Sequence, residues 1–147
     1  MRAENTCGSG TFGDGSGSPD PRDLLDATLP PDCPAGGPTG GALINFRIVS
    51  ESLTVWATDG PFIDRAKELL AGGARQIPTF NKLLDGRSYD PQWTWHVDPQ
   101  NLSFATAAIE LCDGLPSGIE ANKPYWLNTV GSYCPWAAVV RAVDDRR

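Results

Sequence analysis

The stretch YDPQWTWHVDPQNLSFATAAIELCD, residues 89–113, decides how the chain is expected to fold. From Trp93 to Val97, apolar and polar residues alternate, which is the pattern of a half-buried strand. The next four residues, Asp98 to Asn101, suit a type I turn, with Asp first and Pro second. A return strand from Leu102 would place Phe104 opposite Trp95. We therefore predict a β-hairpin centred on this turn.

A helix is the alternative for the second half of the stretch. Residues 103–112 contain three alanines, which are good helix formers, and Gly114 follows as a stop signal. The strand interpretation is preferred because the turn chemistry and the aromatic pair agree with it. That interpretation also places Glu110 on the face of Trp95 and Phe104, where an unpaired charge would be costly.

The composition restricts the classes of function. The 147 residues are 40% apolar, which is enough for one domain with a core. The formal net charge is −6 and no basic cluster occurs, so a nucleic-acid partner is not expected. No apolar run is long enough to span a membrane. The first residues, MRAENTCGSG, lack the apolar core of a signal peptide, so an exported protein would be a trimmed mature form.

The four cysteines indicate disulfides rather than a zinc site. They form no C-x-x-C pair, and the chain has a single histidine. Four cysteines allow three connectivities. We favour Cys7–Cys33 and Cys112–Cys134, because each bridge then closes its own segment. Two disulfides predict an oxidising compartment: secreted, periplasmic or at the cell surface.

Residues 1–41 differ in composition from the rest of the chain. They hold nine of the 16 glycines and six of the 13 prolines, with few apolar side chains. Such a segment cannot bury enough surface to offset its ordering entropy. We predict a flexible N-terminal segment over residues 1–41 and a single domain over residues 42–147.

Alternating and helical patterns predict the elements of that domain. Strands are expected around residues 44–48, 53–57, 77–84 and 137–143, besides the central hairpin. Asp59 or Gly60 caps an amphipathic helix that ends at Gly72-Gly73. Ser117 and Glu120 suggest a capping box for a short helix that Pro124 ends, with a loop over residues 125–132. The expected fold class is α+β: a mainly antiparallel sheet of about five to six strands, one amphipathic helix, one short helix and two disulfides.

Several of these motifs together resemble a poorly characterised family of small extracellular-type domains from bacteria and amoebae. The resemblance covers roughly residues 42–140 and is carried by FRIV, VWATD, W-x-W-H-V-D-P, A-I-E-L-C-D-G and Y-C-P-W. It implies a single α+β domain in which the second disulfide is intact. It implies no activity.

His96, Asp98 and Glu110 are the candidate metal ligands, because imidazole and carboxylate groups bind metals and move protons. Strand parity separates His96 from Glu110 unless a bulge in the return strand, or the helical alternative, brings Glu110 round to His96. A lone histidine in a Trp-rich strand is more often a structural hydrogen-bonding group. A small metal-dependent enzyme centred on His96 is therefore the alternative function, and no cofactor is predicted.

The aromatic residues suggest a binding function. Exposed Trp and Tyr rings are flat platforms for sugars or protein partners. Alternation assigns Trp93 and Trp95 to the core, which leaves Tyr89, Tyr125 and Trp126 as candidate ligand contacts. The sequence therefore predicts a secreted, monomeric, non-enzymatic domain that binds a carbohydrate or a protein partner.

Overall fold

The computed structural model describes residues 4–5, 8–9 and 38–147. The chain divides into two compact units, Met1–Pro38 and Thr39–Arg147. In the first, β1 (Glu4–Asn5) pairs antiparallel with β2 (Gly8–Ser9). The predicted Cys7–Cys33 disulfide lies outside the described residues. The second unit carries the features discussed below.

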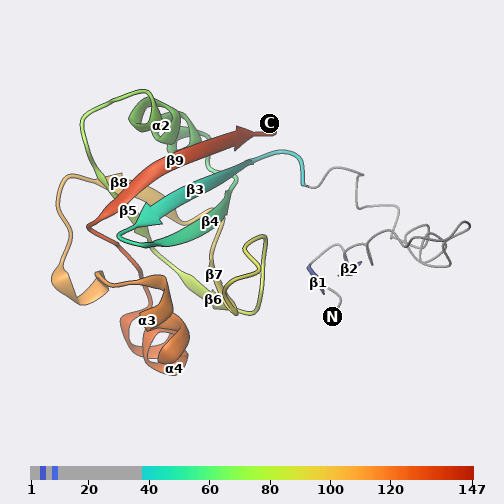
Figure 1. Ribbon diagram of the computed structural model, residues 1–147, viewed down its shortest axis with the longest axis vertical. Coiled ribbons are helices and arrows are strands. Elements are labelled where there is room, and N and C mark those ends of the chain that lie inside the picture. Colours follow the sequence, from blue (N-terminus) through green and yellow to red (C-terminus); the bar gives the residue numbers. More distant parts are fainter. Residues whose placement is uncertain (1–3, 6–7, 10–37) are drawn as a thin grey trace, which may run out of the picture. The chain divides into compact units, whose positions relative to one another are not determined.

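The main sheet contains three antiparallel strands in the order β4-β3-β9 (Figure 1). These are β3 (Ala42–Ile48), β4 (Glu51–Ala57) and β9 (Ala138–Asp145). Alternate residues of β3 and β4 are buried, as the sequence pattern predicts. The register of β3 with β9 shifts between Asn45 and Phe46, which marks a bulge.

Helix α2 (Gly60–Leu70) runs along β9 on the core side of this sheet. The Asp59 carboxylate accepts a hydrogen bond from the amide of Phe62 at 2.8 Å, so the predicted cap is confirmed. The buried residues of α2 are Phe62, Ile63 and Ala66. Leu70, which the helical spacing places on the same stripe, is instead 45% exposed. The chain leaves the helix at Gly72, whose φ of 101° requires a glycine.

Four short strands form two smaller antiparallel sheets. Strand β5 (Ile77–Phe80) pairs with β8 (Leu102–Ala105), and β6 (Leu83–Asp85) pairs with β7 (Trp95–Val97). The two arms of the predicted hairpin, β7 and β8, therefore do not pair with each other. Both run antiparallel to the single segment from residue 77 to residue 85.

The Asp98–Asn101 turn forms, but it does not reverse the chain. The amide of Asn101 donates to Asp98 O at 3.2 Å, and on either side the chain remains bonded to Asn81 and Lys82. The turn is an excursion within one long strand, and the reversal lies between Gly86 and Thr94. The predicted hairpin is therefore wrong: its two arms, β7 and β8, pair with β6 and β5 and not with each other.

The expected Trp95–Phe104 pair is wrong for the same reason. Phe104 lies opposite Pro78 in the ladder and stacks on Phe62, with ring centroids 4.4 Å apart. The helical alternative for residues 103–112 is also wrong for most of its length. The strand continues to Ala105, and only Glu110–Cys112 forms a 3₁₀ turn, η1.

The C-terminal part is more helical than expected. Helix α3 (Pro116–Ala121) is followed by α4 (Lys123–Tyr125) and a π-helical turn, η2 (Trp126–Val130), so the predicted loop over residues 125–132 is wrong. Pro124 does not end a helix, because it occupies the first turn of α4, where its missing amide hydrogen is not needed.

The predicted capping box of Ser117 and Glu120 does not form either. The amide and hydroxyl of Ser117 donate to the Glu51 carboxylate, which lies on β4. Glu120 binds Thr94 instead. Both side chains therefore tie α3 to segments distant in sequence, β4 and the residue before β7, rather than capping it.

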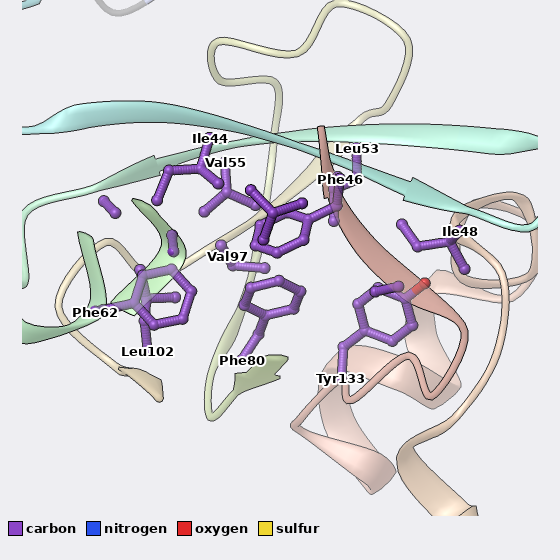
Figure 2. Close-up of a cluster of buried hydrophobic side chains, with 14 of the residues drawn as sticks. Ile44, Phe46, Ile48, Leu53, Val55, Phe62, Phe80, Val97, Leu102 and Tyr133 are labelled. Atoms are coloured by element: carbon purple, nitrogen blue, oxygen red, sulfur yellow. The ribbon is translucent and has the colours of Figure 1, made fainter. Parts of the chain in front are cut away.

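The core between the main sheet and the smaller sheets is rich in aromatic rings. Figure 2 shows Phe46 above Phe80, with Phe62 on one side of Phe80 and Tyr133 on the other. The Phe46 and Phe80 rings meet edge to face at 5.6 Å, and Tyr133 also packs edge-on against Trp95. Burial raises the pKa of Tyr133 well above its ordinary value.

The α+β class and the antiparallel pairing are confirmed, whereas one sheet of five to six strands is wrong. The unit Thr39–Arg147 contains seven strands in three sheets, because the turn at residues 98–101 interrupts the strand that pairs with residues 77–85. The Cys112–Cys134 disulfide is confirmed, with Cα atoms 5.1 Å apart. Within the described residues, no helix has the length and apolar content needed to cross a bilayer.

Candidate binding groove

A groove lies between the end of α2, strands β5 and β8, and the beginning of β9. Its apolar part has a volume of about 200 Å³ and is lined by Phe46, Leu69, Gly73, Pro78, Phe104, Ala138, Val139 and Val140. A more open hollow of about 450 Å³ is lined by Ile77, Thr106, Trp136 and Ala137. Arg75 and Gln76 line both, so we treat the two as one groove.

Arg75 and Gln76 belong to the linker between α2 and β5, and hydrogen bonds hold this linker in place. Arg65, on α2, donates to the Gln76 side chain at 2.7 Å and to the carbonyl of Ala74 at 3.1 Å. The Arg75 guanidinium donates to the carbonyl of Trp136 at 2.5 Å. The wall of the groove is therefore pre-formed rather than dependent on a ligand.

Trp136 is the exposed aromatic residue in the lining of the groove, and 39% of its surface is accessible. Its amide donates to the Asp113 carboxylate at 2.8 Å. Next to it, the amide of Cys134 donates to Cys112 O at 2.7 Å, beside the disulfide. The bridge and Asp113 therefore fix the backbone that carries this ring.

Sequence reasoning missed Trp136, because the pattern places it at the start of the last strand. The amide of Ala138 donates to Pro135 O at 3.2 Å, so a turn separates Trp136 from the strand alternation. Pro135 is the signal that predicts such a turn.

None of the three sequence-predicted ligand contacts lines this groove. Tyr89 is half-buried and packs against Trp56 with centroids 5.5 Å apart. Tyr125, on α4, is 40% exposed. Trp126 is only 9% exposed and packs edge-on against Tyr133, so its ring is a core group rather than an open platform. Whether Tyr89 or Tyr125 contacts a ligand stays a prediction.

The three predicted metal ligands serve different local structures. His96 Nδ1 donates to the carbonyl of Gly86 at 2.8 Å, which closes the end of the β6–β7 ladder. Asp98 accepts from the amide of Gln100 at 3.0 Å, which holds the pKa of that carboxyl below its ordinary value. Within the described residues, no three His, Cys, Asp or Glu side chains gather closely enough to hold a metal ion.

Glu110 lies in the exposed η1 turn, so its expected place on the core face is wrong. The reason is that the chain leaves the strand after Ala105, which ends the strand parity before residue 110 is reached.

A polar cluster connects the β6–β7 hairpin to the C-terminal helices. The Glu120 carboxylate accepts from the Thr94 amide at 3.0 Å and from its hydroxyl at 2.6 Å, which holds the pKa of Glu120 below its ordinary value. Lys123 donates to the Thr94 hydroxyl at 3.1 Å and to Asp85 at 2.7 Å, and that contact lowers the pKa of Asp85. Each charge has a partner within the cluster, so we interpret it as structural.

Comparison with known proteins identifies the family. The family model of the BP-74 N-terminal domain matches residues 42–146. Since this range is more than half of the 147 residues, the chain belongs to that family. No curated protein matches the chain, and no solved structure matches it.

Proposed function

We propose that this member of the BP-74 N-terminal domain family is a secreted, non-enzymatic binding domain, and that its ligand occupies the groove beside Trp136. One observation carries the proposal: an exposed tryptophan lines an open hollow, and that hollow shares Arg75 and Gln76 with an apolar hollow that the fold does not fill. Aromatic anchors beside pre-formed apolar hollows are typical of sites for sugars and protein partners.

The polar groups of the groove support binding rather than packing. Arg75, Gln76 and Thr106 line the open part, so a ligand meets hydrogen-bonding groups around an apolar centre. The Cys112–Cys134 disulfide supports the extracellular part of the proposal, because disulfides persist mainly in oxidising compartments.

Two-dimensional NMR of the ¹⁵N-labelled full chain tests the site with small probes: indole, phenol and methyl β-glucoside. We expect at least one probe to shift the backbone signals of Gln76, Ala137 and Val139 and the indole signal of Trp136. The substitution Trp136→Ala should abolish these shifts.

Tyr125→Ala is the matched control, because Tyr125 is exposed to the same degree as Trp136, 40% against 39%. We expect this variant to bind the probes like the native chain. Shifts that gather at Tyr125 or Tyr89 and persist in Trp136→Ala would contradict the proposal and favour the sequence-predicted contacts.

A further inference from the structure

We propose that the groove binds an extended acidic peptide, which adds a strand to the free edge of β9 and places one apolar side chain in the hollow. This inference rests on the proposed function and deepens it by naming the class of ligand. Three observations carry it: the unpaired edge of β9, the position of the apolar hollow along that edge, and the charge around it.

The first observation is that β9 is an edge strand. Within the unit Thr39–Arg147, it pairs with β3 on one side and with no strand on the other. No other described segment donates to or accepts from its backbone between Val139 and Asp144 on that outer side. A row of unpaired amide and carbonyl groups is the surface that an added strand requires.

The second observation is that the hollow follows this edge. Three consecutive residues of β9, Ala138 to Val140, line it, although Val139 is exposed and its two neighbours are buried. The hollow therefore reaches round the edge of the strand instead of lying on one face of the sheet. Its volume of about 200 Å³ suits one large apolar side chain.

The third observation is the charge. Arg47 lies opposite Val139 on β3, Arg75 lines the hollow, and Arg141 follows on β9. None of the three forms an ion pair with a described residue, in a chain whose net charge is −6. By contrast, Asp144 and Asp145 near the other end of β9 pair with Arg146 and Arg147. Acidic residues on the ligand would therefore meet uncompensated positive charge.

The same charges argue against a second copy of this chain as the occupant. Antiparallel pairing of two β9 edges would bring the arginines of this region close to each other, and like charges across a ladder are destabilising.

The probe that tests the inference is the peptide Glu-Val-Glu-Phe-Glu-Val-Glu, acetylated at its N-terminus and amidated at its C-terminus. Its glutamates share one face of a strand, and Phe with its flanking valines shares the other. We expect the oxidised full chain to bind it, and binding to weaken as salt is added. Replacing every Glu by Lys, or Phe by Ala, should weaken binding at least about tenfold.

Main-chain pairing is tested with two N-methylated forms of the peptide and the unaltered protein. One form is methylated at the amides of the second and third glutamates of the peptide, and the other at the amides of its phenylalanine and second valine. Alternate amides of a strand point to opposite sides, so only one form should lose binding. Equal binding by the two forms would overturn the inference.

Val139→Glu tests the edge on the protein, with Tyr125→Glu as the matched control. The two side chains are exposed to a similar degree, 42% and 40%, and Tyr125 lies on α4 and lines neither hollow. We expect Val139→Glu to weaken peptide binding at least about tenfold and Tyr125→Glu to change it less than about twofold. If the small probes shift the groove but the peptide does not bind, this inference fails while the proposed function stands. If neither binds, both fail.

Discussion

The two edges of the main sheet are treated in opposite ways. The β4 edge is covered by an irregular segment that starts at the buried Asp90. The Asp90 carboxylate accepts from the Thr54 amide at 2.7 Å, and the Trp93 indole donates to the carbonyl of Ser52 at 3.1 Å. Farther along the edge, the Thr58 amide donates to Pro99 O at 3.0 Å. Side chains and turns thus satisfy this edge without adding a strand.

At the β9 edge, α2 packs along the strand, but no described segment bonds to the outer backbone groups of Val139 to Asp144, and an apolar hollow adjoins them. Proteins normally blunt exposed edges, because unpaired backbone groups recruit other chains. In this chain a separate segment blocks the β4 edge, whereas the backbone of the β9 edge stays open. If both edges only needed protection against aggregation, we would expect both to be blocked. The difference supports β9, not β4, as the edge that meets a partner.

The largest expected effect comes from breaking the disulfide that leads into β9. The double substitution Cys112→Ser and Cys134→Ser opens a bridge between residues 22 apart in sequence. We expect a loss of about 3 kcal/mol in the free energy of unfolding, measured with urea, because the unfolded chain regains loop entropy. In the variant, the rate of backbone hydrogen exchange should rise more at residues 134–140 than at Thr54.

The comparison of exchange rates is the internal control of that experiment. If exchange rises equally at Thr54 and at residues 134–140, the bridge stabilises the whole domain and does not specifically hold the open edge. Retention of the native stability would show that the bridge contributes nothing to the folded unit.

A smaller effect is expected from Asp90→Ala on the protected edge. Asp90 is 5% exposed and is the buried charged residue of the described core. Its carboxylate accepts from the amides of Thr54 and Gln92 and from the Gln92 side chain. Removing it leaves buried donors without acceptors, so we expect a loss of about 2 kcal/mol in urea unfolding.

Asp98→Ala is the matched control for that loss. The Asp98 carboxylate also accepts within a turn, from the backbone amide of Gln100 and the side chain of Asn101, but the turn is more exposed. We expect it to lose about 1 kcal/mol or less. An equal loss in the two variants would show that Asp90 stabilises a local turn and not the β4 edge.

Asp90→Ala should also self-associate at high concentration, as measured by light scattering, because its β4 edge is no longer blocked.

Local patterns predicted the elements that local chemistry determines. The alternation in β3 and β4, the Asp59 cap and the Asp98 turn are all present. Which strands pair could not be predicted in the same way. The sequence of a turn does not determine whether the chain reverses there or continues along the same partner strand. Here hydrogen bonds to Asn81 and Lys82, far away in sequence, keep β7 and β8 on the same partner segment.

The candidate groove was less predictable for the same physical reason. Its lining comes from α2, β3, β5, β8 and β9, which no single sequence window contains. The predicted capping box is absent for a similar reason. The Glu120 carboxylate accepts from the amide and hydroxyl of Thr94 instead of from its own helix. A side chain's partner is set by what packs against it, and that depends on the fold.

The smallest expected effect concerns the pH dependence of the β4 cover through Glu120. This carboxylate holds Thr94, the residue after Trp93, so it positions the segment that protects β4. Its pKa is lowered in the folded protein, first by the Thr94 hydroxyl. The stabilisation by Glu120 is therefore complete above the ordinary glutamate pKa and is lost as the pH falls through the lower pKa of the folded protein.

In Glu120→Gln, the free energy of unfolding should vary less with pH in this acidic range. Hydrogen exchange at Thr54, corrected for its intrinsic pH dependence, should show a relative rise in the native chain as the pH falls, while exchange in β9 does not. If acid loosens both edges together, or if Glu120→Gln keeps the full pH dependence, Glu120 does not control the protected edge.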